Sequence, residues 1–539
     1  MKLFLLINIF LIISSINEIN SLNCASNKIK INSGVLHIPN YKSRRRMDNK
    51  DDNKNYTNIK IGVDYTNFKE TNLTNQSNCN KIKELINETI TDFQKLIKIE
   101  HRKINLTNIK NSNITIKSRC NLETLNENYG DFLIDNDVII FVSVKDDLDD
   151  ILVSGSNCLF TFDYRIIGGV LYINNNINFT KKNSDLYFKY CLLHELTHIL
   201  IFDPNILKGL EMITKKKNKY YVNSKTVLEK ARMHFNCKSL MGVQLEDIEE
   251  GGEKIAGYHW DPRYMLGDYM ISFDYMDVVI SDITLALFED SGFYEVNYYT
   301  GGLFKFGKNK GCDFINLNIT NSSLFNDYFC FVPGISQCSQ SRASTGHCTI
   351  YNYSKEIDEK GYQIFNNHYI GGLKRMNYAP IPEVGAIGEN DLDYFPQSCY
   401  SIKDEENKIN WEARGNKSFC FMNSLTNNSS DVSNKMEAMC YQVECNINKT
   451  LSIYVNGNII NCHNETKNVQ QGIYGSIECQ KYNDICNADN TTCNEIFNCI
   501  NYKISVDYNS YDYNFNQSTF IYNKVKFLFL MTLIILFLN

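Results

Sequence analysis

The stretch Cys191-Leu192-Leu193-His194-Glu195-Leu196-Thr197-His198 carries two histidines four positions apart, with a glutamate directly after the first. On an α-helix, residues at i and i+4 lie on the same face, so both imidazoles can bind one zinc ion. The glutamate can then accept a proton from a zinc-bound water, as the general base of a hydrolytic reaction. Leucine and isoleucine side chains around the motif predict a buried helix, and Asn183-Ser184-Asp185 predicts its N-terminal cap.

The motif supplies only two of the three protein ligands that a catalytic zinc ion normally has. In the compact pattern His-Glu-x-x-His-x-x-Gly-x-x-His, the third ligand stands six residues after the second histidine, where this chain has Pro204. Two downstream histidines are candidates, His234 and His259. A glutamate is the other option, so these residues alone leave the third ligand open.

The composition restricts the class of protein and its environment. The 539 residues are enough for roughly two to four domains. A net charge of −6 gives no indication of a basic surface for nucleic acid. Nineteen cysteines indicate an oxidising compartment. Sequons that could carry glycans agree with secretion and stand at Asn72, Asn105, Asn178, Asn318, Asn428 and Asn490.

Both ends of the chain carry apolar segments. Residues 1–21 predict a secretory signal, with a retained membrane anchor as the alternative. Residues 22–57 predict a short pro-region with a processing site at Arg44-Arg45-Arg46, or an unstructured basic linker. Residues 516–539 predict a GPI-anchor signal with Asn516 as the attachment residue, or alternatively a hydrophobic tail anchor. Either anchor would hold the protein on a membrane at the cell surface.

Between the two ends, the pattern of apolar residues predicts an α+β fold. Strands are predicted at Ile59–Tyr65, Asp137–Val144 and Gly168–Asn174. Helices other than the one with the zinc motif are predicted at Ile82–Ile99, Lys225–Phe235 and Asp282–Asp290. We assign residues 58–202 to an N-terminal catalytic subdomain and residues 203–300 to a central subdomain.

Residues 301–515 differ in character from the part before them. Thirteen of the nineteen cysteines lie between Cys312 and Cys499, and few long periodic segments occur there. This density predicts a disulfide-rich C-terminal domain. The last cysteines could instead bind a metal, but they form no Cys-x-x-Cys pair. Disulfides are therefore the prediction for Cys479, Cys486, Cys493 and Cys499.

Several segments downstream of the zinc motif resemble one family. In chain order they are His234–Glu246, Gly251-Gly252, His259-Trp260-Asp261-Pro262-Arg263, Gly267-Asp268-Tyr269-Met270 and Thr284–Tyr294. This order resembles the leishmanolysin family of zinc metallopeptidases, which are metzincins. The resemblance covers roughly residues 59 to 500 and is most specific from 184 to 300.

The resemblance implies a metzincin-like catalytic region with a mixed sheet and a zinc-binding helix, followed by the disulfide-rich region. It implies His194, His198 and His259 as ligands of one zinc ion, with His234 as the rival third ligand. Glu195 would be the general base, and Met270 would lie beneath the metal as the apolar floor called the Met-turn. The implied activity is that of a zinc-dependent metalloendopeptidase, which hydrolyses peptide bonds of protein substrates at the cell surface.

Family members also pair an extended substrate with an exposed edge strand, and Gly169–Asn174 is the candidate here. A cysteine of the pro-region can block the zinc in such proenzymes. Cys24 is the candidate for this switch, and Cys191 is the rival for the unpaired thiol, as a buried inert residue.

One position departs from the family pattern. Ile201 stands three residues after the second histidine, where the family has glycine at a sharp turn. A left-handed backbone there would cost a β-branched residue about 1–2 kcal/mol. We therefore expect the turn to be built otherwise, a turn later at Asp203-Pro204.

The departure leaves a catalytically impaired adhesion or antigen protein as the alternative function. A thermolysin-like peptidase with a glutamate ligand is a weaker alternative, because it leaves His259 and Met270 unexplained.

Overall fold

The computed structural model describes residues 34–35 and 55–486, apart from 103, 105–111, 126–134, 147, 149–150, 182, 218, 251–252, 274, 276, 297, 299–303, 317–327, 358–362, 385–396, 400–410, 416–417, 432–434, 447, 463–465, 469–472 and 481. The secretory signal, the arginine triplet, Cys24, Asn516 and the C-terminal tail lie outside the described residues.

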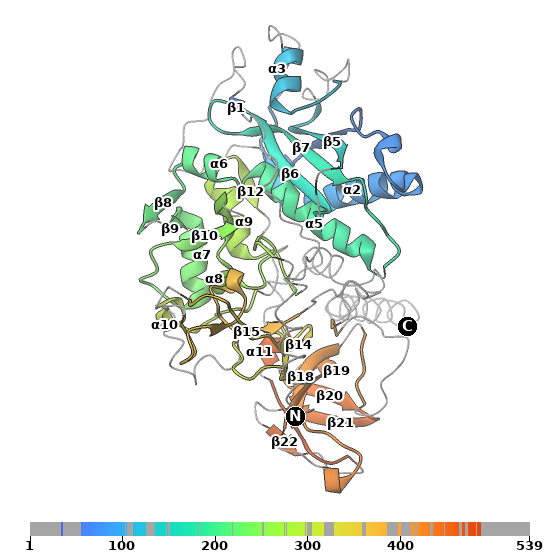
Figure 1. Cartoon of the computed structure of the whole chain (residues 1–539), viewed down its shortest axis with the longest axis vertical. Helices are drawn as coiled ribbons and strands as arrows, with labels where there is room; N and C mark the ends of the chain where they lie inside the picture. The colour runs from blue at the N-terminus through green and yellow to red at the C-terminus, as the bar shows by residue number, and fades with distance from the viewer. Residues whose placement is uncertain are drawn as a thin grey trace, which may run out of the picture.

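The N-terminal part is built on a five-stranded mixed sheet (Figure 1). In sheet order its strands are β1 (Gly34–Val35), β6 (Val153–Phe160), β7 (Ile166–Asn174), β5 (Val138–Lys145) and β3 (Ile61–Asp64). The strands β3, β5 and β7 are parallel, and β6 runs antiparallel to β7. Runs of β-branched residues suit β5 and β7 to burial on both faces.

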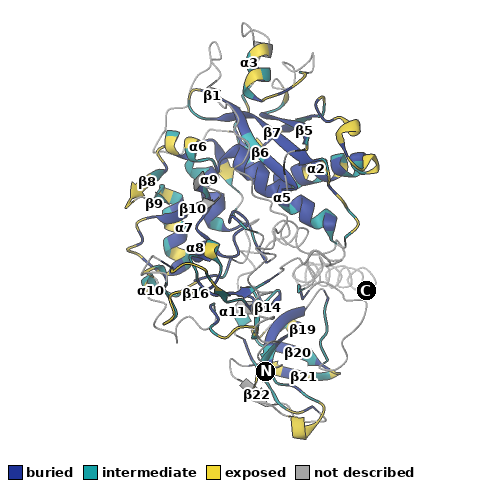
Figure 2. Ribbon diagram, in the orientation of Figure 1, coloured by how far each residue is buried: buried dark blue, intermediate teal, exposed yellow. Residues whose placement is uncertain are grey.

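Two helices pack on one another and cover one face of this sheet, α2 (Cys79–Phe93) and α5 (Ser184–Leu200). Figure 2 shows the sheet and α5 as the most continuously buried part of the molecule. A separate apolar cluster on the sheet, which includes Phe141 and Tyr172, packs with residues of α3 (Ser112–Arg119) and the segment after it. The sheet therefore has apolar packing on both sides, and α5 lies at the centre of the larger core.

The central region packs beside this half through a shared hydrophobic core. Its antiparallel sheet has the order β11 (Glu253–Trp260), β10 (Val243–Glu250), β9 (Lys219–Val222) and β8 (Ile213–Lys216). Its helices are α6 (Pro204–Gly209), α7 (Lys225–Phe235), α8 (Pro262–Met265) and α9 (Asp282–Asp290). The chain then returns to the N-terminal half, because β12 (Tyr294–Val296) pairs with β4 (Ile97–Ile99), which also pairs with β2 (Thr57–Asn58).

The C-terminal region contains a six-stranded antiparallel sheet with its own apolar core. In sheet order the strands are β21 (Asn458–Cys462), β20 (Leu451–Val455), β19 (Glu437–Cys445), β18 (Ser418–Asn423), β23 (Ser476–Glu478) and β22 (Thr466–Asn468). Shorter elements precede or follow it: α10 (Cys312–Asn316), β13 (Ser336–Cys338), β14 (Thr345–Cys348), β15 (Tyr351–Asn352), β16 (Ile370–Gly371), β17 (Pro382–Glu383) and α11 (Tyr482–Ile485).

Disulfides hold this region together, as its cysteine density predicts. They join Cys330 to Cys348, Cys338 to Cys420, Cys399 to Cys440, Cys445 to Cys486 and Cys462 to Cys479. Two more join Cys120 to Cys158 and Cys237 to Cys312. The choice of disulfides over a metal is thus confirmed for Cys479 and Cys486, whereas Cys493 and Cys499 lie outside the described residues.

The predicted α+β class, with its mixed sheet and disulfide-rich C-terminal region, is confirmed, but two details are wrong. The helix predicted to reach Ile99 ends at Phe93, because the next apolar residues form β4 and pair with β2 and β12. The candidate edge strand Gly169–Asn174 belongs to β7, which has β5 on one side and β6 on the other. Its hydrogen-bonding groups are occupied within the sheet, so it has no free edge to offer a substrate. The subdomain boundaries stay predictions.

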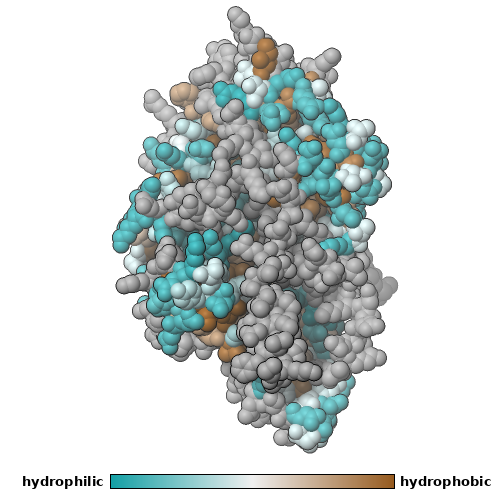
Figure 3. All heavy atoms as spheres, viewed as in Figure 1, coloured by the Kyte–Doolittle hydropathy of each residue, from teal (hydrophilic) through white to brown (hydrophobic). Residues whose placement is uncertain are grey.

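The surface in Figure 3 is mainly hydrophilic over the outer side of α2 and over the β8–β9 hairpin. Hydrophobic side chains form only small areas on the described part of this face. None of the helices in the described part of the chain has the length and apolar character that a membrane span requires.

Candidate metal centre

The two histidines of the motif lie on α5 with the geometry that their spacing predicts. The helix begins at Ser184 after Asn183, whose backbone is left-handed (φ 59°) and whose side chain makes no capping hydrogen bond. The N-terminal boundary is therefore as predicted, but the side-chain cap is not formed. His194 and His198 are both buried, and their Nε2 atoms are 2.9 Å apart.

His259 of β11 completes a cluster of three imidazoles. Its Nε2 lies 3.2 Å from Nε2 of His194 and 3.1 Å from Nε2 of His198. Nitrogen ligands at about 2.0–2.1 Å from a tetrahedral zinc ion are separated by about 3.3 Å. The three observed separations between Nε2 atoms are close to this value. Within the described residues, these three histidines are the group of side chains placed to hold a metal ion. The buried triad fits one zinc ion, as predicted.

The opposite nitrogen of each ring is hydrogen-bonded to oxygen. Nδ1 of His194 lies 2.7 Å from the carbonyl of Tyr269, and Nδ1 of His198 lies 2.8 Å from the carbonyl of Phe202. Nδ1 of His259 contacts the carboxylate of Glu246. Since carbonyl oxygens only accept, the proton of His194 and His198 is on Nδ1 and the lone pair of Nε2 points into the cluster.

Burial also favours the neutral form of His194 and His198, which is the form that binds a metal. Loss of solvation lowers the pKa of His194 to about 3, and the neighbouring His259 adds to this effect. Burial likewise lowers the pKa of His198 well below its ordinary value. The two histidines of α5 are therefore ready to bind a cation near neutral pH.

Glu195 follows His194 on α5 and is fully buried. Its Oε2 accepts a hydrogen bond of 2.6 Å from the backbone N–H of Gly155 in β6, while Oε1 has no partner among the described residues. A β-carbon at Gly155 would lie 2.9 Å from Cβ of Glu195, so glycine permits this approach of strand to helix. Burial raises the pKa of Glu195 well above its ordinary value. Sequence reasoning missed Gly155, because its strand was not predicted.

The end of α5 resolves the question of Ile201. Its backbone (φ −152°) is outside the left-handed region, and its N–H and that of Phe202 both donate to the carbonyl of Thr197. Asp203 then caps α6, because its carboxylate accepts from the N–H groups of Asn205 and Ile206. The prediction that the turn is built without a left-handed residue at position 201 is confirmed. Its predicted location is not, because the chain turns at Ile201 and Asp203-Pro204 already begin α6.

The Met-turn residue Met270 is fully buried in the main core. Its N–H donates to the carboxylate of Asp268 (2.8 Å), and its carbonyl accepts from the N–H of Trp260 (3.0 Å). These bonds attach the turn to the strand that ends just after His259. The role of Met270 as a floor beneath the metal remains a proposal.

The structure places the remaining candidates elsewhere. His234 on α7 bonds through Nε2 to the carbonyl of Phe306 (2.8 Å) and stacks on Phe304, so it is not part of the cluster. The expectation of an unpaired thiol at Cys191 is wrong, because Cys191 is disulfide-bonded. The free cysteine of the described part is Cys79, which is buried in α2.

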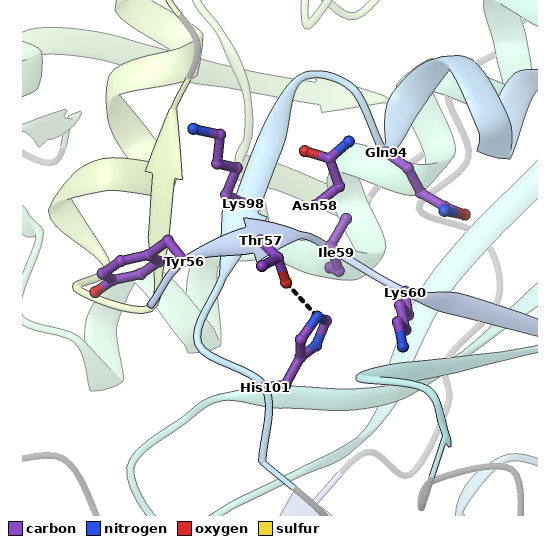
Figure 4. A pocket seen from close by; sticks show the side chains of 8 residues that line it. All are labelled: Tyr56, Thr57, Asn58, Ile59, Lys60, Gln94, Lys98 and His101. Carbon is purple, nitrogen blue, oxygen red and sulfur yellow. Dashed lines mark hydrogen bonds between the residues drawn. The ribbon is translucent and has the colours of Figure 1, made fainter. Parts of the chain in front are cut away.

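A surface pocket of about 570 Å³ lies apart from the cluster and shares no residue with it (Figure 4). Its lining residues are Tyr56, Thr57, Asn58, Ile59, Lys60, Gln94, Lys98 and His101. His101 bonds to Thr57 at one side of its ring and to Asp137 at the other, 2.5 and 2.6 Å away. Because Asp137 forms a buried ion pair with Arg165, we interpret these contacts as structural.

Comparison with known proteins agrees with the zinc site that the geometry indicates. The family model described as Leishmanolysin matches residues 10–493. The chain is 23% identical over 399 residues to a leishmanolysin homolog of Crithidia fasciculata, covering 67% of this chain and 57% of that protein. It is 25% identical over 317 residues to leishmanolysin of Leishmania tropica, covering 55% and 47%. A leishmanolysin-like peptidase of Drosophila melanogaster is 35% identical over 159 residues, covering 27% and 23%. The chain thus spans about half of the length of the first two relatives and a quarter of the third.

Proposed function

Since this chain belongs to the leishmanolysin family, we propose that it is a zinc-dependent metalloendopeptidase that hydrolyses peptide bonds of protein substrates. The observation that carries this proposal is the convergence of three buried Nε2 atoms, with a fully buried carboxylate on the residue that follows His194. Three imidazole ligands leave a tetrahedral zinc ion one position for water or substrate.

A zinc ion held by His194, His198 and His259 would supply Lewis acidity, which polarises a peptide carbonyl and lowers the pKa of a water molecule. Glu195 would act as the general base, taking the proton of the attacking water on Oε1 and passing it to the leaving amine. Gly155 holds the other oxygen, so the carboxylate keeps one orientation while Oε1 remains available.

The strand β6 is the part of the sheet best suited to bind an extended substrate. On its outer side it pairs with β1 at Leu159 and Phe160. The segment Gly155–Asn157 has no strand partner on that side within the described part of the chain. A substrate strand added there would lie beside Glu195, because Gly155 contacts that residue. We propose β6 in place of the strand rejected above.

The location of the protein is proposed in two steps. The disulfides and the family point to an extracellular or secreted protein. Attachment to the cell surface through residues 516–539, and latency through Cys24, remain proposals that depend on segments outside the described residues.

The proposal is tested by the zinc content and the peptidase activity of purified wild type and Glu195→Ala. We expect both proteins to hold about one zinc ion per chain. We expect the variant to hydrolyse an unfolded protein substrate at least about 100-fold more slowly, because general base catalysis contributes roughly 10²–10⁴. His259→Ala should lose the metal, whereas the matched variant His234→Ala should keep it.

A wild-type protein that binds zinc but hydrolyses the substrate no faster than Glu195→Ala would contradict the proposed peptidase activity. It would favour the alternative of a catalytically impaired adhesion protein. Retention of stoichiometric zinc by His259→Ala would show that the third ligand is another residue.

A further inference from the structure

We propose that Glu246 is a positioning residue, which fixes His259 in the orientation that binds the metal. The proposal rests on the function proposed above and names a residue outside the zinc motif. Glu246 lies on β10, its side chain is 2% exposed, and its carboxylate accepts the Nδ1–H of His259. Within the described part of the chain it has no other hydrogen-bond or ion-pair partner.

The three imidazoles are held in different ways. His194 and His198 belong to the same helix, and each donates to a backbone carbonyl that no side-chain substitution removes. His259 comes from a different element and depends on a side chain for its Nδ1 partner. It is therefore the ligand whose orientation a single residue can control.

The pairing of β10 with β11 explains why Glu246 and His259 meet. Leu245 pairs with Trp260, but Asp247 pairs with Ala256, so Glu246 faces three residues of β11 where a regular ladder has one. This bulge includes Gly257, whose backbone is left-handed (φ +91°), a conformation that glycine adopts at low cost. Bulges of this kind redirect side chains, and they are common beside active sites.

The charge of Glu246 has a chemical consequence for the ligand. A buried carboxylate is costly unless it is paired, so the pairing with the imidazole stabilises both groups. Accepting the Nδ1 proton fixes the tautomer of His259 and increases electron density at Nε2. Carboxylate partners of this type typically change metal affinity by about 10–100-fold.

The test uses the full chain and three variants. Glu246→Gln keeps an oxygen acceptor for His259 but removes the charge, and Glu246→Leu removes both. The matched control is Gln244→Met, which alters a buried residue two positions earlier on β10 that bonds to Asp261 instead of a ligand. Zinc affinity is measured by competition with a chelator, and the visible spectrum of the cobalt(II)-substituted protein reports the ligand field.

We expect Glu246→Gln to weaken zinc binding about 10-fold and Glu246→Leu about 100-fold, both with a shifted cobalt spectrum. Gln244→Met should stay within about twofold of wild type with an unchanged spectrum. Wild-type zinc affinity and spectrum in both Glu246 variants would overturn the proposal. So would an equal loss in Gln244→Met, which would indicate a general effect on β10.

Failure of this inference differs from failure of the proposed function. If wild type binds zinc and depends on Glu195 while the Glu246 variants behave as wild type, only the role of Glu246 is wrong. If wild type itself binds neither zinc nor cobalt at stoichiometric concentration, the proposed function fails first. Melting temperatures of the metal-free proteins show whether a variant has lost its fold instead of its ligand.

Discussion

At the residue scale, Ile201 shows how a substitution in a family motif can be accommodated. The residue is 1% exposed and packs in the main core, and its backbone (φ −152°, ψ −40°) avoids the left-handed conformation that is costly for a β-branched residue. The carbonyl of the next residue, Phe202, still reaches Nδ1 of His198. Isoleucine has therefore been built into the core without disturbing a ligand.

Replacing Ile201 by the glycine of the family should harm this protein. Loss of the buried side chain and the freer backbone of glycine should lower the free energy of unfolding by about 3–5 kcal/mol. The control Ile201→Val should cost only about 0.5–1.5 kcal/mol. Denaturant unfolding measures both, and a peptidase assay should find no gain in activity for Ile201→Gly. A more active or equally stable glycine variant would mean that the left-handed turn is the preferred one.

Individual site residues differ in how far the sequence reveals them. The order of motifs along the chain indicates His194, His198, His259 and Glu195. The structure brings the three histidines together and buries Glu195, which follows His194 on the same helix. Gly155 and Glu246 could not be found in that way. Their contacts depend on a tight approach of β6 to α5 and on a strand bulge, and neither feature has a sequence signal of its own.

At the scale of elements, Asp268 joins the Met-turn to α9. One carboxylate oxygen accepts the N–H of Met270, and the other accepts the hydroxyl of Thr284 (2.7 Å) and the N–H of Ser281 (3.3 Å). Despite these bonds, burial raises the pKa of Asp268 from 3.8 to about 6. The folded protein therefore binds this proton more tightly than the unfolded chain.

This shift predicts a stability that falls as the pH rises. Asp268 contributes roughly 3 kcal/mol to the free energy of unfolding. This contribution is fully present below about pH 4 and is lost as the pH rises to about 6. In Asp268→Asn, the free energy of unfolding should no longer fall in this way between pH 4 and 6. The exposed control Asp431→Asn should keep the pH dependence of wild type. The free energy of unfolding is measured from pH 4 to 7 after metal removal, because a bound dication would favour the charged carboxylate. Parallel curves for wild type and Asp268→Asn would contradict the shift.

Elements were predictable where their pattern is regular. The predicted bounds of α7 and α9 agree with the structure, and β5 and β7 are recognisable from their β-branched runs. The strand β6 was missed because Ser154-Gly155-Ser156-Asn157 has the composition of a turn. The same small residues allow Glu195 to approach the strand, so the contact itself removes the usual sequence signal.

At the scale of the molecule, the cysteine-rich region contacts the segment that carries the Met-turn. Arg375 donates to the carbonyl of Ser272 (2.5 Å), and Arg263 donates to the carbonyl of Asn377 (2.8 Å). The side chain of Asn377 in turn donates to Asp261 (3.0 Å). The cysteine count predicts a stapled region but not which cysteines pair. The two arginine contacts do not follow from sequence either, because they join residues more than 100 positions apart.

These contacts predict that the C-terminal region stabilises the metal centre. Arg375→Ala should lower the free energy of unfolding by about 1.5–3 kcal/mol, the usual contribution of a hydrogen bond from a charged group. Zinc release to a chelator should also become severalfold faster, because Ser272 lies three residues after Tyr269, whose carbonyl orients His194. The exposed neighbour Lys374 is the matched control, since Lys374→Ala leaves these contacts in place. Stopped-flow zinc release and thermal unfolding of both variants decide the matter. Equal release rates in wild type and Arg375→Ala, with only the melting temperature lowered, would mean that the region supports the fold and not the metal.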